Sequence, residues 1–187
     1  MALLSDGNRY VHGRESYRYV EKLIRSGNEV CIVSPYIDPY YAAFIRKNAH
    51  ARRFYVVSSS LDRGAARILT SRSSPIGVVL FATLVLCIDY AVSVLGFLSA
   101  AILLLSASVI FLRFAVFKVF GRNMISLRMP KNFVHAKIYV SDRMAINGSA
   151  NLTYRGMHSN IEHIEITTEK AAVEKLRREF WDLWGSV

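Results

Sequence analysis

Residues 133–140 read FVHAKIYV, and this stretch decides how the sequence is interpreted. Apolar and polar side chains alternate along it with a period of two, which is the pattern of a β-strand. The apolar members, expected on one face, are Val134, Ala136, Ile138 and Val140. His135, Lys137 and Tyr139 fall on the opposite face. We therefore predict a strand over residues 133–140 whose open face carries both an imidazole and an ammonium group.

The same stretch begins a longer pattern of polar residues. His135 and Lys137 are followed after four further residues by Asp142, and residues 148–151 read GSAN. Phosphodiester cleavage needs a nucleophile, a proton for the departing oxygen, and donors for the remaining phosphate oxygens. An imidazole serves as nucleophile or acid, an ammonium binds phosphate, and serine and asparagine add donors. Either fragment alone would fit an ordinary strand histidine or an ordinary turn, but together they indicate phosphodiester chemistry.

A carboxylate on the second ring nitrogen would fix the tautomer of the histidine. Residues 160–166 read NIEHIEI, the pattern of another strand, and they supply Glu162 and Glu165 as candidates. Asp142 comes directly after the histidine strand. We interpret Asp142 as a residue that holds the following turn rather than one that contacts the substrate.

These residues resemble the signature of the phospholipase D superfamily, His-x-Lys-x4-Asp followed by Gly-Ser-x-Asn. The single copy resembles the short, endonuclease-type branch of that superfamily. The resemblance implies a covalent phosphohistidine at His135, phosphate binding by Lys137 and Asn151, and support from Ser149. It also implies that Glu162 orients the imidazole, because Glu162 lies at the offset where short members carry their glutamate.

Larger members of this superfamily carry two copies of the motif, and their two histidines divide the roles of nucleophile and acid. This chain has one copy, so the resemblance implies that a second protomer supplies the other His135. A homodimer that shares its active site is therefore expected. Asp142 and Gly148 are expected to be structural members of the motif. Neither a metal ion nor another cofactor is expected.

Residues 76–120 form an apolar block in which only Asp89, Arg113 and Lys118 are charged. About 20 apolar residues, at about 1.5 Å each, cross the roughly 30 Å of a bilayer's hydrocarbon core. The block is long enough for two crossings, and we predict a transmembrane hairpin over 75–120 with its turn near residues 95–96. If the strands before and after it belong to one fold, the number of crossings must be even. The alternative, a helical pair buried in a soluble core, would need more covering surface than a small domain has.

The hairpin divides one phospholipase D-like domain into an N-terminal half, residues 1–74, and a C-terminal half, residues 121–187. Arginines lie on both sides of the apolar block, whereas its turn contains no lysine or arginine. By the positive-inside rule we expect a multi-pass protein of the cell membrane whose catalytic domain faces the cytoplasm. The first residues show no cleavable signal pattern.

The remaining patterns predict an α/β fold, a mixed β-sheet flanked by helices. Besides the histidine strand, strands are expected at 30–34, 53–58, 124–129, 144–147 and 161–167. Helices are expected at 15–25, within 36–48, and over a C-terminal stretch that includes residues 173–183. Residues 61–74, rich in arginine, serine and threonine, are interpreted as a juxtamembrane connector.

The formal net charge of +10 suits an anionic partner, either acidic lipid headgroups or nucleic acid. We favour a phospholipid substrate, because an anchor inserted within the catalytic fold would fix the site over the bilayer. The alternative is a membrane-tethered endonuclease for single-stranded DNA or RNA, with Tyr36, Tyr40 and Tyr41 as candidate stacking residues. A binding protein without turnover is disfavoured by the intact set of catalytic residue types.

Overall fold

The computed structural model describes residues 2–5, 8–49, 51–71, 83 and 124–187. The chain divides into two units, Met1–Ser71 with Asn123–Val187 and Arg72–Arg122. Apart from Thr83, the hairpin predicted over residues 75–120 lies outside the described residues. Within the described ranges, no helix is both long and apolar enough to span a membrane. The fold described below is that of the first unit.

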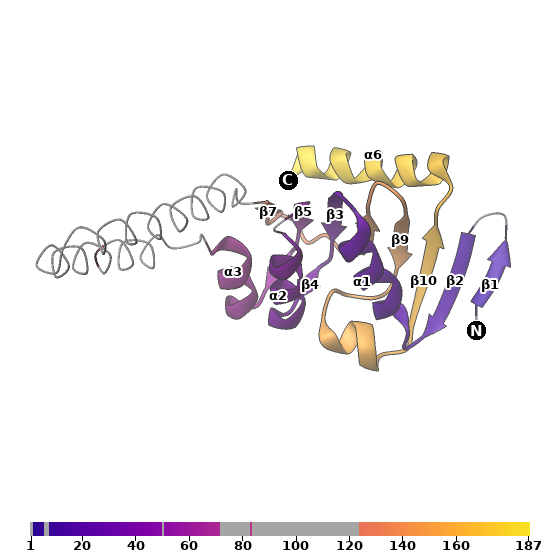
Figure 1. Cartoon of the computed structure of the whole chain (residues 1–187), viewed down its shortest axis with the longest axis horizontal. Helices are drawn as coiled ribbons and strands as arrows, with labels where there is room; N and C mark the ends of the chain where they lie inside the picture. Colours follow the sequence, from indigo (N-terminus) through magenta and orange to yellow (C-terminus); the bar gives the residue numbers. More distant parts are fainter. Residues whose placement is uncertain (1, 6–7, 50, 72–82, 84–123) are drawn as a thin grey trace, which may run out of the picture. The chain divides into compact units, whose positions relative to one another are not determined.

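An eight-stranded mixed sheet forms the centre of this unit, in the order β1-β2-β10-β9-β8-β3-β5-β7 (Figure 1). The strands β3, β5 and β7 are parallel to one another, and the remaining neighbours are antiparallel. A separate parallel pair joins β4 to β6. The strands span β1 (Ala2–Ser5), β2 (Asn8–Gly13), β3 (Glu29–Val33), β4 (Tyr36–Ile37), β5 (Arg53–Val57), β6 (Ser60–Leu61), β7 (Ile125–Arg128), β8 (Ile138–Val140), β9 (Ala145–Gly148) and β10 (Glu162–Thr167).

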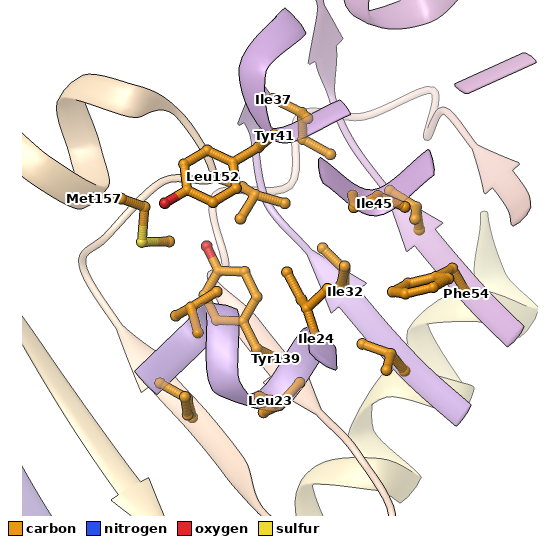
Figure 2. Close-up of a cluster of buried hydrophobic side chains, with 14 of the residues drawn as sticks. Leu23, Ile24, Ile32, Ile37, Tyr41, Ile45, Phe54, Tyr139, Leu152 and Met157 are labelled. Carbon is orange, nitrogen blue, oxygen red and sulfur yellow. The ribbon is translucent and has the colours of Figure 1, made fainter. Parts of the chain in front are cut away.

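Helices cover both faces of the sheet. The helical elements are α1 (Ser16–Ser26), α2 (Pro39–Asn48), α3 (Arg63–Thr70), the π-helical turn η1 (Arg155–Ser159) and α6 (Lys170–Ser186). The larger core cluster draws on α1, α2 and α3, and its centre is drawn in Figure 2. The smaller cluster lies under α6, which buries Val173 and Phe180. The prediction of a mixed sheet flanked by helices is confirmed.

Local sequence explains where the two main helices of the larger cluster begin and end. Helix α1 buries Val20, Leu23 and Ile24, which share one helical face, and it ends where the Gly27 N–H donates to the Leu23 carbonyl. Helix α2 begins at Asp38, whose carboxylate accepts from the N–H of Tyr41, with a proline at the first helical position. This combination of N-cap and proline fixes the helix start.

The hydrophobic side chains of residues 134–140 divide between the two hydrophobic clusters, one on each face of the sheet. The cluster under α6 contains Val134, Ala136, Ile138 and Val140. Tyr139 instead belongs to the larger cluster and lies among Leu23 and Leu152 (Figure 2). At Lys137 and Tyr139 the face expected to be open is therefore covered, because α1 packs over it, whereas His135 is exposed. Tyr139 is 1% exposed and Lys137 only 7%.

Three expectations about the elements were wrong or incomplete. The histidine strand is shorter than predicted, since β8 spans only Ile138–Val140 and His135 and Lys137 precede it. The connector predicted over residues 61–74 contains helix α3, which Asp62 caps and which buries Ala65 and Leu69 at a helical spacing of four. The N-terminal strands β1 and β2 were not predicted, and β2 pairs along the whole of β10.

Candidate active site

Three neighbouring strands bring the motif residues to one end of the sheet. Lys137 immediately precedes β8, and its carbonyl accepts from the N–H of Gly148 at the end of β9 (3.3 Å). The next N–H, that of Ser149, donates to the carbonyl of His163 in β10 (2.9 Å). Because β9 is antiparallel to both β8 and β10, Lys137, Ser149 and Glu162 lie at the same end of three adjacent strands. Strand pairing therefore brings Lys137, Ser149 and Glu162 together although they are 12 to 25 positions apart in the sequence.

The imidazole of His135 lies exposed beside the ammonium of Lys137. The Lys137 Nζ atom is 3.2 Å from Nδ1 and from Nε2 of the ring, and it donates to the His135 carbonyl at 2.8 Å. An ammonium group has donors only, so a ring nitrogen that it approaches as a hydrogen-bond partner presents a lone pair. Backbone contacts fix this segment, because Ser59 Oγ donates to the Val134 carbonyl and accepts from the Val134 N–H.

Two charged side chains of the site are buried. Lys137 is 7% exposed and Glu162 is 8% exposed. Burial lowers the pKa of Lys137, and the negative charge of Glu162 opposes that shift. The two groups therefore interact electrostatically, and Glu162 helps to keep the ammonium protonated.

The hydroxyl of Ser149 and the carboxylate of Glu162 form a close pair. Ser149 Oγ donates to Glu162 Oε2 and also accepts from the N–H of His163 (3.0 Å). The other carboxylate oxygen, Oε1, accepts from the side-chain amide of Asn160 (3.1 Å). The hydrogen bonds of Glu162 thus go to Ser149 and Asn160, whereas the neighbour of the imidazole is Lys137.

The turn that carries Asn151 is held from three directions. The buried hydroxyl of Tyr139 donates to the Ala150 carbonyl (2.7 Å). Ser34, at the end of β3, accepts the N–H of Leu152 (2.9 Å). Asp38 accepts the N–H of Tyr154 in addition to capping α2. The side-chain oxygen of Asn151 is buried and accepts no hydrogen bond from any residue that the structure describes.

Gly148 meets a steric requirement that no other residue type fulfils. Its φ is +153°, a conformation that L side chains rarely adopt. A Cβ atom at this position would overlap the carbonyl oxygen of His163 and lie 2.8 Å from Ile164 Cα. The close approach of β9 to β10, which positions Ser149 beside Glu162, therefore depends on glycine.

The structure places Asp142 and Glu165 away from this cluster. Asp142 accepts from the backbone and side-chain N–H groups of Asn28 (3.1 and 3.4 Å), and so it joins the β8–β9 turn to the start of β3. Glu165 accepts from the Tyr10 hydroxyl (3.0 Å) and borders a hollow lined by residues of α6. Because side chains alternate along β10, Glu162 and Glu165 lie on opposite faces of the sheet.

Residues that hold the Asn151 turn were missed by the sequence reasoning. Ser34 and Asp38 lie more than 110 positions before the residues that they bind. The Asp38-Pro39 pair gave a local signal for a helix start, but nothing in the sequence indicated its second partner. Tyr139 was predicted to lie on an open face. It is buried instead, and its hydroxyl donates to the Ala150 carbonyl.

Comparisons with known proteins agree with this geometry. Residues 107–184 match the family described as "Cardiolipin synthase, PLD-like domain". Over these residues the chain is therefore similar to a phospholipase D-like domain. None of the curated proteins compared with the sequence matches it.

Solved structures share the fold over nearly the whole chain. Nuc, a phospholipase D family member from Salmonella typhimurium, is 13% identical with a TM-score of 0.58, over 96% of this chain and 95% of that one. NucT from Helicobacter pylori is 13% identical with a TM-score of 0.54, over 96% of each chain. Polyphosphate kinase from Porphyromonas gingivalis is 13% identical with a TM-score of 0.50, over 96% of this chain but 26% of that one. At these identities the likeness is one of fold.

Proposed function

We propose that this protein is a membrane-embedded phosphodiesterase that cleaves a phospholipid through a covalent phosphohistidine at His135. The observation that carries the proposal is the Lys137 ammonium, 3.2 Å from both nitrogens of an exposed imidazole. A candidate nucleophile and a cation for the phosphate oxygens thus lie side by side at the end of the sheet. The phospholipase D-like domain and the family description, which names a cardiolipin synthase, support a phosphodiester of lipid as the substrate.

In the first step, a ring nitrogen of His135 attacks phosphorus, and the bond from phosphorus to the departing oxygen breaks. A second imidazolium donates its proton to that oxygen, which leaves as an alcohol. Lys137 and Asn151 donate to the nonbridging oxygens as negative charge grows on them. The product is a phosphohistidine on His135.

In the second step, a water molecule or an alcohol attacks phosphorus. The second imidazole, now neutral, takes the proton of the attacking oxygen, and the phosphorus–nitrogen bond breaks to regenerate His135. Glu162 acts indirectly, since its charge favours the ammonium form of Lys137 and it holds the Ser149 hydroxyl. The scheme uses no metal ion, so EDTA should leave turnover unchanged.

The second imidazole has to come from another protomer. One ring cannot serve as nucleophile and acid in the same step, and the motif occurs once in the chain. We propose a twofold homodimer in which two copies of His135, Lys137 and Asn151 face one phosphate. The exposed position of His135 at the end of the sheet is compatible with such a shared site.

We further propose that residues 75–120 anchor the domain as a transmembrane hairpin, with the site on the cytoplasmic side of the cell membrane. The length of the uncharged stretch and the arginines that flank it support this arrangement. The net charge of +10 would favour an inner leaflet rich in anionic lipid.

The second candidate function is cleavage of single-stranded DNA or RNA. It is favoured by the exposed rings of Tyr36, Tyr40 and Tyr154, which are 45%, 48% and 50% exposed and resemble stacking platforms for bases. Tyr41, which the sequence also suggested, is buried in the core and is not available for stacking. Purified full-length protein should be incubated with labelled phospholipid vesicles and, separately, with single-stranded DNA and RNA, with His135→Asn as the control. Cleavage of lipid that the variant lacks is the expected result. Cleavage of nucleic acid that the variant lacks, with intact lipid, would establish the second candidate instead.

A further inference from the structure

A clamped loop presents apolar side chains next to the nucleophile. Residues 129–133 connect β7 to the segment that carries His135. Before the loop, the Arg128 carbonyl accepts from the N–H of Ser58 (3.2 Å), and the Arg128 side chain binds carbonyls at the C-terminus of α6. After the loop, Ser59 binds both backbone groups of Val134. The loop is thus fixed at both ends.

Its apolar side chains nevertheless point into solvent. Met129 is 57% exposed and Phe133 is 56% exposed. The Phe133 ring lies 6.0 Å from the His135 ring and 5.9 Å from the ring of Tyr36, which is itself 45% exposed. Exposed apolar groups of this size, beside a reactive group and on a clamped loop, are typical of a contact surface.

The chemistry of these side chains favours hydrocarbon over a base. Phe133 and Met129 have no hydrogen-bonding group that could read a base, and methionine offers no ring for stacking. The Tyr36 and Phe133 rings are inclined at 54°, and their centroids are 5.9 Å apart. A base held between two rings needs parallel faces about 7 Å apart, twice an ordinary carbon contact. Lys131, exposed in the same loop, suits an anionic headgroup.

We propose that Met129, Phe133 and Tyr36 form an interfacial surface that enters the acyl region of a phospholipid bilayer beside His135. The surface rests on the proposed function for its lipid substrate. It places the phosphate of a lipid at the imidazole while the chains of that lipid stay in apolar surroundings. Aromatic and long apolar side chains with a neighbouring lysine are suited to such an interface.

Tryptophan quenching by brominated lipid measures contact with the membrane separately from catalysis. Phe133→Trp and, as a control, Tyr19→Trp are made in the full chain and reconstituted in vesicles of phosphatidylglycerol and brominated phosphatidylcholine. Tyr19 contacts Arg9, which pairs with Ile166 at the opposite end of β10 from Glu162. Bromine on the acyl chains quenches only tryptophan that reaches them. The fluorescence of the native Trp181 and Trp184 is measured on the wild type and subtracted. The remaining tryptophan fluorescence should be quenched for Phe133→Trp and not for Tyr19→Trp.

A second measurement uses Phe133→Ser. The ratio of its rate on lipid vesicles to its rate on soluble bis(4-nitrophenyl) phosphate should fall about tenfold, because a buried phenyl contact with the bilayer is lost. The proposal is overturned if the two tryptophan variants are quenched equally, if single-stranded DNA rather than lipid quenches Phe133→Trp, or if Phe133→Ser dissociates a dimer. Quenching without lipid cleavage would instead refute the proposed function and leave the surface standing.

Discussion

Gly148 gives the sharpest test of how the two halves of the motif are brought together. Gly148→Ala adds a Cβ to a residue with φ of +153°, and that atom would meet the His163 carbonyl and Ile164 Cα. The unfavourable backbone conformation costs about 1–2 kcal/mol. Overpacking against backbone that cannot give way adds about 1–3 kcal/mol. The expected destabilisation, about 2–5 kcal/mol, is a large part of the roughly 5–15 kcal/mol of a typical domain.

Two other glycines separate these contributions. Gly13 has φ of +135° but open space around a Cβ, so Gly13→Ala should cost only the backbone term. Gly185 lies within α6 with no heavy atom near a Cβ, so Gly185→Ala should be neutral or stabilising. Thermal unfolding followed by circular dichroism measures all three. At about 2–4 °C per kcal/mol for a chain of this size, Gly148→Ala should lower Tm by roughly 4–20 °C.

The ranking of the three variants is the result that matters. Gly148→Ala should be the least stable, Gly13→Ala intermediate, and Gly185→Ala close to the wild type. A Gly148→Ala protein no less stable than Gly13→Ala would refute the close approach of β9 to β10 on which the Ser149–Glu162 pair depends.

Three further predictions concern residues around the site. Tyr139→Phe leaves the buried Ala150 carbonyl without its donor, which should cost about 1–3 kcal/mol and lower kcat/KM through the Asn151 turn; an unchanged Tm would contradict this. Because burial lowers the pKa of Lys137, the ammonium is lost at a pH below the ordinary lysine value of about 10.4, so activity should fall on the alkaline side before that pH and Lys137→Arg should remove this fall. Asp142→Ala should lower the free energy of unfolding by about 1 kcal/mol with normal turnover, and loss of turnover in a stable protein would place Asp142 in the chemistry instead.

Much of the fold follows from local patterns in the sequence. The four apolar residues around His135 share one face as predicted, because side chains of consecutive strand residues point to opposite faces. The face predicted to be open is covered at Lys137 and Tyr139, however, and alternation alone cannot reveal that α1 packs there. Helix α3 was missed because its arginines and the serines that follow it resemble a connector, while the two residues that it buries are too few to stand out.

The sequence motif named the candidate residues of the site, but it did not show the contacts among them. The spacing of the motif named His135, Lys137, Ser149 and Asn151 as candidates, whereas Ser34 and Asp38, which hold the backbone of the Asn151 turn, lie more than 110 positions before the residues that they bind. The choice between Glu162 and Glu165 illustrates this, since either carboxylate fits the sequence. The structure separates them by strand parity, because Glu162 faces Ser149 and Glu165 faces the side of α6.

The shared site is the central claim, and mixed dimers test it most directly. Wild-type chain and His135→Asn are co-expressed at equal levels, so that protomers pair at random, and activity is measured per total protein. If each site needs both imidazoles, only dimers with two wild-type protomers turn over, and activity should be about one quarter of that of the wild type. Activity of about one half would show that each protomer works alone, and it would contradict the account.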